Sequence, residues 1–232
     1  MGLSAKWKTT IDDAIANKAW DDYDKLMKAE VDGYQARFAA TNPSADWKLF
    51  KAIAWTESGG PASPAWKARV LQIGNPGDSA YAVLKKGTEG AEVVLSDQLK
   101  RDIASGSIND PTLNVKAGIA YVYVRLSRTA FESVLDTKDT ATQEYTVAAG
   151  DSFDSIARKV GTTIAVLQQL NADKNVLHAK DIVKYRKAAI KRVLKGWLSF
   201  NTKNIAQRYN VGDPDYAAKL DYCLLVMGKL KR

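Results

Sequence analysis

The first residue that could do chemistry is a glutamate in the segment AIAWTESGG, residues 52–60. Glu57 stands at the end of an apolar, helix-like run and is followed by a serine and two glycines. Leu49, Ile53 and Glu57 fall at about 0°, 40° and 80° around a helix with 100° per residue. Glu57 therefore lies on the face that the helix is expected to bury.

Burial and position both favour the neutral form of this carboxyl group. The dipole at a helix C-terminus disfavours negative charge, and desolvation raises the pKa of a carboxyl group. A carboxyl group that stays protonated near neutral pH beside an exposed, glycine-rich turn suits a general acid. The alternative is a glutamate at a helix end whose side chain simply turns to solvent.

Cysteine and histidine offer little chemistry in this sequence. Cys223 is the single cysteine and His178 the single histidine. These counts exclude a disulfide framework and a cysteine-based zinc site. Cys223 lies in the apolar run DYCLLVM and is predicted to be a buried core residue. His178 lies in a polar stretch and is predicted to be an exposed loop residue.

Most of the chain has the periodicity of helices that could position Glu57. The elements predicted before residue 143 are a helix at 22–39, a helix from caps at 42–46 to about Ser58, an irregular Gly- and Pro-rich lobe at 60–90, a helix at about 91–104, and a helix opened by Asp110 and Pro111. The last helix contains AGIAYVYVRL, which is apolar nearly all round, so it belongs at the centre of a bundle.

The sequence changes character near residue 143. EYTV and DIVKYRK are typical of short strands, and GDSFDSIARKVG and TTIAVLQQLN of short helices between them. These segments predict a compact strand–helix–helix–strand module. Helical periodicity is predicted to return in AIKRVLKGWLSF and NIAQRYN. A last helix opened by Asp213 and Pro214 follows, with Tyr216 and Leu220 on one face.

Four segments in order resemble the lytic transglycosylases with a lysozyme-like fold. They are WKLFKAIAWTESGG, VLQIGNP, DPTLNVKAGIAYVYVRL and IAQRYNVGDPDYAAKL. The resemblance implies that Glu57 is the catalytic acid/base. It also implies a set of substrate-binding residues around it: Ser58, Gln72, Tyr121, Tyr209 and Asn210. The chain departs from the family where Gly-Leu-Met-Gln is replaced by RVLQ and followed by IGNPGD.

The module near residues 145–187 resembles a LysM domain. The matching residues are Tyr-Thr-Val, Gly-Asp-Ser-Phe, Gly-Thr-Thr and Leu-x-x-Leu-Asn. This resemblance implies binding of N-acetylglucosamine chains in a groove between residues 150–155 and 171–180. The residues implied are Gly150, Asp151, Ser152, Phe153 and Asn171.

Together these observations predict a mainly α, lysozyme-like catalytic domain with an inserted α+β (βααβ) LysM module. The predicted segments are 1–142 and 188–232 for the catalytic domain and 143–187 for the module. Surface loops tolerate such insertions when the ends of the module are close. The alternative is a tail domain followed by an unrelated helical piece, against which YNVGDPDYAAKL argues.

The expected function is cleavage of peptidoglycan between N-acetylmuramic acid and N-acetylglucosamine, with a 1,6-anhydro product. One alternative is a hydrolytic muramidase, for which Asp78 or Glu89 would supply a second carboxylate; Asp110 is better explained as a helix cap. The other is a non-catalytic peptidoglycan-binding protein. No cofactor or metal is implied.

The net charge of the chain agrees with peptidoglycan as its partner. The net charge of +8 suits an anionic cell wall. It also permits nucleic acid, but no groove-reading or stacking motif supports that partner. Glycan strands are the expected ligand, and the protein is expected to be a monomer.

The expected substrate predicts that the protein is made in the cytoplasm and acts on the cell wall or in the periplasm. Neither a signal peptide nor an apolar run of membrane-spanning length is visible, although the substrate lies outside the cytoplasm. Phage lysins and effectors delivered by bacterial secretion machines share this mismatch. An effector would imply an immunity protein that blocks the cleft.

Overall fold

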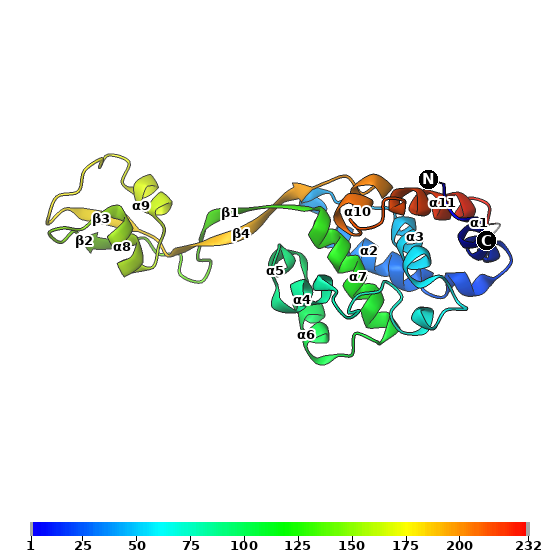
Figure 1. The fold of residues 1–232 in the computed structure, drawn as a ribbon. Helices are drawn as coiled ribbons and strands as arrows, with labels where there is room; N and C mark the ends of the chain where they lie inside the picture. The colour runs from blue at the N-terminus through cyan, green and yellow to red at the C-terminus, as the bar shows by residue number, and fades with distance from the viewer. Residues whose placement is uncertain (1, 231–232) are drawn as a thin grey trace. The chain divides into compact units, whose positions relative to one another are not determined.

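The computed structural model describes residues 2–230, so Met1 and the last two residues of the predicted catalytic segments lie outside it (Figure 1). The chain forms two compact units. One comprises the chain up to Thr129 and from Leu194 onward, and the other comprises Ala130–Val193. The second unit therefore interrupts the first in sequence.

Helices make up most of the first unit. In chain order they are α1 (Ala5–Asp12), η1 (Asp13–Ile15), η2 (Lys18–Asp21), α2 (Asp24–Arg37), η3 (Ala39–Thr41), α3 (Trp47–Ser58), η4 (Pro64–Lys67), α4 (Ser79–Lys86), α5 (Ala91–Val94), α6 (Asp97–Ser105), α7 (Pro111–Leu126), α10 (Thr202–Arg208) and α11 (Tyr216–Met227). The prediction of a mainly α architecture is confirmed for this unit. Within residues 2–230, no helix is long and apolar enough to cross a membrane.

Helix α7 lies at the centre of the helical unit and packs against α2, α4, α5, α6 and α10. Asp110 caps it by accepting a hydrogen bond from the Leu113 N–H at 2.8 Å, and Pro111 occupies its first turn. Most of its residues are buried, including Val115, Ile119 and Tyr123. The prediction of a capped, all-round apolar central helix is confirmed.

Two predicted stretches differ in detail. The helix predicted over 91–104 is divided into α5 and α6, because the Ser96 hydroxyl accepts the Leu99 N–H and caps a new helix there. The lobe predicted to be irregular over 60–90 contains η4 and α4. Asp78 caps α4 through the Ala80 N–H, a signal that the many glycines and prolines of the lobe obscured.

The prediction of a helix in AIKRVLKGWLSF is wrong. Strand β4 (Ala188–Trp197) pairs there with β1 (Ser127–Leu135) in a two-stranded sheet (Figure 1). The partner strand lies more than fifty residues away, so no local periodicity reveals it. The two strands also carry the chain between the two units.

The smaller unit contains the predicted strand–helix–helix–strand module. Its elements are β2 (Gln143–Thr146), α8 (Phe153–Val160), α9 (Ile164–Leu170) and β3 (Ile182–Tyr185). β2 and β3 pair antiparallel, with Gln143 opposite Tyr185. The core of this unit consists of Val147, Ile156, Ala157, Val160, Leu167 and Val183. It is separate from the core of the helical unit, so each unit buries its own apolar surface.

Cys223 is fully buried in α11, as predicted. Burial raises the pKa of its thiol to about 12. A neutral, buried thiol is a poor nucleophile, because the thiolate is the reactive form. The structure therefore agrees with a packing role for this residue.

Candidate active site and glycan-binding module

Glu57 lies in the last turn of α3, directly before a turn that requires glycine. Gly59 and Gly60 have φ angles of 74° and 83°, a region that favours residues without a side chain. A Cβ atom at Gly60 would also lie 2.1 Å from the ring of Trp20. The two glycines thus end α3 sharply and leave the glutamate at the helix terminus.

The Ser58 side chain points into this turn. Its hydroxyl donates to the Ala54 carbonyl at 2.6 Å and accepts the Gly60 N–H at 3.1 Å. The residue is buried. Ser58 therefore fixes the backbone behind Glu57, and both of its hydrogen bonds are internal.

Two side chains from the C-terminal part of the chain contact the Glu57 carboxyl group. The Tyr216 hydroxyl donates to Oε1 at 2.6 Å, and the Asn210 amide donates to the same oxygen at 3.5 Å. Burial raises the pKa of Glu57, while these two hydrogen bonds lower it to a smaller extent. The more distant charges oppose each other, because Asp213 raises this pKa and Lys219 lowers it.

A cavity of about 180 Å³ opens beside Glu57. Four more of the predicted site residues line it with Glu57: Gln72, Tyr121, Tyr209 and Asn210. The rings of Tyr121 and Tyr209 lie 5.7 Å apart, and the Tyr209 hydroxyl donates to the Leu71 carbonyl at 2.8 Å. The structure thus brings together residues from α3, α7 and the segment after α10.

Gln72 also lines the cavity, but its side chain is held locally. Its amide nitrogen donates to the Arg69 carbonyl at 2.7 Å, and its amide oxygen accepts from Asn75 at 2.7 Å. Its φ angle is 55°, which is uncommon outside glycine. This uncommon φ angle falls in the segment RVLQ, residues 69–72.

A buried asparagine on α7 holds the wall that contains Gln72. Asn114 accepts the Leu71 N–H at 2.9 Å and donates to the carbonyls of Ile73 and Ile108 at 2.9 and 3.0 Å. A Cβ atom at Gly118 would lie 2.4 Å from Leu71, so glycine is needed for the close approach of this wall to α7. Both residues belong to the DPTLNVKAG segment.

The two carboxylates considered for a hydrolytic mechanism differ in position. Asp78 lines the cavity with Glu57, and its two oxygens accept the N–H groups of Ala80 and Gly74 at 2.7 and 2.9 Å. Glu89 instead forms an ion pair with Arg125 at 2.8 Å. Of the two, Asp78 is therefore the one that shares a cavity with Glu57.

Tyr216 and Asn114 have site roles that the sequence did not predict. The sequence predicts Tyr216 on the apolar face of the last helix, yet its hydroxyl is the nearest donor to Glu57. Both residues stand inside the quoted motifs, in DPDYAAKL and DPTLN. A polar atom at a position expected to be buried was the signal that could have identified them.

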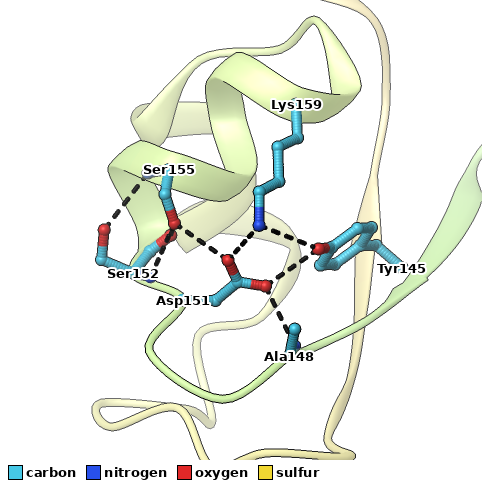
Figure 2. A network of polar contacts seen from close by, with 6 residues as sticks. All are labelled: Tyr145, Ala148, Asp151, Ser152, Ser155 and Lys159. Carbon is cyan, nitrogen blue, oxygen red and sulfur yellow. Dashed lines mark hydrogen bonds and ion pairs between the residues drawn. The ribbon is translucent and has the colours of Figure 1, made fainter.

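Asp151 organises the loop between β2 and α8 (Figure 2). One carboxylate oxygen accepts from Lys159 at 2.5 Å and from Ser155 at 3.2 Å. The other accepts the Ala148 N–H and the Tyr145 hydroxyl, both at 2.9 Å. The side chain is only 4% exposed. The Lys159 ammonium, followed by the Ala148 N–H, lowers the pKa of Asp151.

The other predicted glycan-binding residues occupy different environments. Ser152 caps α8 reciprocally with Ser155, and Gly150 has a φ angle of 83° in the loop before it. Phe153 is partly buried against the core of the smaller unit, and the His178 side chain is exposed, as predicted.

Asn171 has its polar atoms directed inward. It donates to the carbonyls of Leu167 and Lys184 and accepts the Lys184 N–H, each at 2.8 Å. Asn171 therefore joins α9 to β3 and shapes the module from inside.

Comparison with known families identifies the smaller module. The model of the LysM domain family matches residues 145–183, which cover the end of β2, all of α8 and α9, and the beginning of β3. The chain therefore contains a LysM domain, which indicates binding to peptidoglycan glycan chains. No curated protein and no solved structure matched the chain.

Proposed function

We propose that this protein cleaves the β-1,4 bond between N-acetylmuramic acid and N-acetylglucosamine in peptidoglycan, with Glu57 as general acid/base. The observation that carries the proposal is a partly buried carboxyl group with a raised pKa that lines a cavity. Its presence in one chain with a LysM domain supports peptidoglycan as the substrate. The order of the four sequence segments supports a lysozyme-like catalytic domain.

The contacts of Glu57 suggest how the proton is placed. Tyr216 and Asn210 both donate to Oε1, so Oε2 is the oxygen assigned to carry the transferable proton. Glu57 donates this proton to the glycosidic oxygen as the bond to the muramyl C1 breaks. The substrate's acetamido group stabilises the cationic centre. Glu57 then accepts the proton of the muramyl 6-hydroxyl, whose oxygen bonds to C1 and gives the 1,6-anhydro product.

The test is Glu57→Gln, assayed on purified sacculi. The amide keeps the size and the acceptor oxygen but cannot donate the proton, so we expect cleavage to fall by about 10³-fold. Binding to sacculi should remain, because the LysM domain is unchanged. Glu89→Gln is the matched control, since it removes a carboxylate that pairs with Arg125, and it should retain activity. Cleavage by Glu57→Gln at the wild-type rate would refute the catalytic role.

A hydrolytic muramidase is the second candidate, because Asp78 shares the cavity with Glu57. A second carboxylate can orient water or stabilise the cation. Mass spectrometry of the products separates the two reactions: 1,6-anhydro ends support the transglycosylase and reducing ends the hydrolase. Asp78→Asn keeps the helix cap to Ala80 through its amide oxygen but loses the acceptor for the Gly74 N–H. It should abolish the hydrolytic reaction and leave most of the transglycosylase reaction.

A further inference from the structure

The smaller unit has a groove that shares only one residue, Asp154, with the segments predicted to bind glycan. This groove has a volume of about 700 Å³ and lies between the α8–α9 turn and the beginning of β4. Its walls include Arg158 and Ile164 on the helical side and Lys187, Ile190 and Lys191 on the strand side. All of its lining residues belong to the unit Ala130–Val193.

The groove runs along the edge of β4. Four consecutive residues, 188–191, line it, although alternate side chains of a strand point to opposite faces. The Lys187 carbonyl accepts the Asp136 N–H at 2.8 Å, toward β1, while the Ala188 N–H points the other way, to the Gly161 carbonyl at 3.3 Å. Backbone alternation then directs the N–H and C=O of Ile190 away from β1, into the groove.

The lining combines apolar side chains with positive charge. Ile190 is 61% exposed and Ile164 is 40% exposed, so both present apolar surface at the groove. Asp154 is occupied by an ion pair with Arg158, and Lys187 donates to the Val160 carbonyl at 2.6 Å. The lining residues carry three cationic and two anionic side chains, and none of these described residues is aromatic. The groove thus offers a strand edge and positive charge, without a ring on which a sugar could stack.

We propose that this groove binds an extended peptide as an added strand on β4. An exposed strand edge binds such a segment through its main chain, while side-chain pockets give selectivity. The net positive lining selects a peptide with carboxylates, and the shallow apolar surface of Ile164 and Ile190 selects small side chains. The occupant is the short, alanine-rich peptide branch of peptidoglycan. The inference rests on peptidoglycan as the target and is independent of the cleavage reaction.

The probe is an N-acetylated synthetic pentapeptide with three alanines, one internal glutamate, one lysine and a free C-terminal carboxylate, so it carries a net negative charge. Binding to the full chain is measured by calorimetry and by the amide NMR shifts of Ile190 and Lys191. Ile190→Pro removes the outward N–H, and we expect the Kd to rise at least tenfold. Proline is tolerated on an edge strand where the N–H faces solvent. Ile190→Val keeps the N–H and should bind the peptide as the wild type does.

A charge variant decides the matter if the proline variant fails to fold. Lys191→Glu reverses an exposed charge at the groove and should weaken the peptide at least fivefold, an effect that decreases as salt is added. Chito-oligosaccharide binding should be unchanged in both variants if they fold. Unchanged peptide affinity in a folded Ile190→Pro or Lys191→Glu variant would overturn the proposal. Groove shifts caused by the oligosaccharide alone would also overturn it, in favour of a glycan site. Activity on soluble glycan fragments reports on Glu57 separately, so the two proposals can fail independently.

Discussion

Two carboxyl groups, one in each unit, have opposite electrostatic environments. The Glu57 carboxyl is partly buried and receives hydrogen bonds from a tyrosine and an asparagine, and desolvation raises its pKa. The Asp151 carboxyl is also shielded, but a lysine and a backbone N–H bind it and lower its pKa (Figure 2). Shielding thus makes a carboxyl group a proton donor only where no cation compensates it. Glu57 is suited to chemistry, and Asp151 to shaping a loop.

The two units share a different structural device. Asn114 in the helical unit and Asn171 in the LysM unit are both buried, and each forms three hydrogen bonds to backbone groups. Asn114 joins α7 to the segment that contains Leu71 and Ile73, and Asn171 joins α9 to β3. Both units therefore use a buried asparagine to fix backbone segments, whereas the pKa of the carboxyl group is raised in one unit and lowered in the other.

The largest expected effect tests this shared device. Asn114→Ala leaves three backbone groups without a partner, and Asn171→Ala leaves two, because the Leu167 carbonyl also accepts the backbone N–H of residue 171. Each such buried group costs about 1–3 kcal/mol. We expect a loss of about 3–5 kcal/mol in the free energy of unfolding of the unit that carries the substitution. Hydrogen exchange, followed residue by residue, should show the loss in that unit alone. Equal loss in both units would contradict two separate cores.

The next effect tests whether the helical unit cleaves the glycan while the LysM unit only binds it. The Asp136 N–H lies 2.8 Å from the Lys187 carbonyl, so a two-residue hairpin turn can replace the segment between them. The shortened chain should still cleave short soluble glycan fragments. Cleavage of sacculi should fall about 100-fold, because tethering raises the effective concentration only for a polymer. Loss of activity on short fragments in a folded variant would place the LysM unit in catalysis.

A smaller effect compares the two carboxyl groups directly. Because the pKa of Glu57 is raised in the folded protein, ionisation of this carboxyl group lowers the free energy of unfolding as the pH rises through that pKa. Glu57→Gln removes this ionisation and should stabilise the protein at pH 7 by about 1 kcal/mol. Near pH 4, where the carboxyl group is protonated, the substitution should leave the stability unchanged. The lowered pKa of Asp151 contributes stability above its unfolded pKa that is lost as the pH falls through the folded pKa. Asp151→Asn should therefore destabilise at pH 7. Denaturant unfolding at pH 4 and pH 7 measures the change in the free energy of unfolding that each substitution causes. Changes of the same sign for both substitutions at pH 7 would contradict the comparison.

Much of the fold and part of the site were predictable from local patterns. The caps Asp46 and Asp110 and the apolar spacing of α2 and α7 mark helices whose signals are contained in one stretch of chain. The LysM module also has its signals within one short segment, and its family match confirms that prediction. The position of Glu57 at the end of α3 followed from the same local rules.

The remaining features depend on partners that are distant in the sequence. β1 and β4 are strands because they pair with each other across the LysM module, and neither shows this alone. Tyr216 reads as one more apolar position of α11 until α3 is placed beside it, 159 residues earlier in the chain. Asn171 resembles a ligand-binding loop residue until β3 supplies its hydrogen bonds.

The smallest expected effect isolates the Tyr216 hydroxyl. Tyr216 is 1% exposed, so Tyr216→Phe keeps the buried ring and removes only the donor to Oε1. This hydrogen bond lowers the pKa of Glu57, so its loss should raise that pKa further. A general acid acts in its protonated form, and the alkaline limb of the pH–rate profile should therefore move to higher pH. At the pH optimum we expect a reduction of about tenfold or less, because the second donor, Asn210, remains.

Tyr209→Phe is the matched control for that substitution. Its hydroxyl donates to the Leu71 carbonyl and not to Glu57, so its loss should affect substrate binding or the cavity wall without moving the alkaline limb in the same way. Rate profiles on a soluble glycan fragment, measured for both variants, give the comparison. If Tyr216→Phe leaves the alkaline limb in place or moves it to lower pH, either the hydroxyl does not set the pKa of Glu57 or that limb reports a different group.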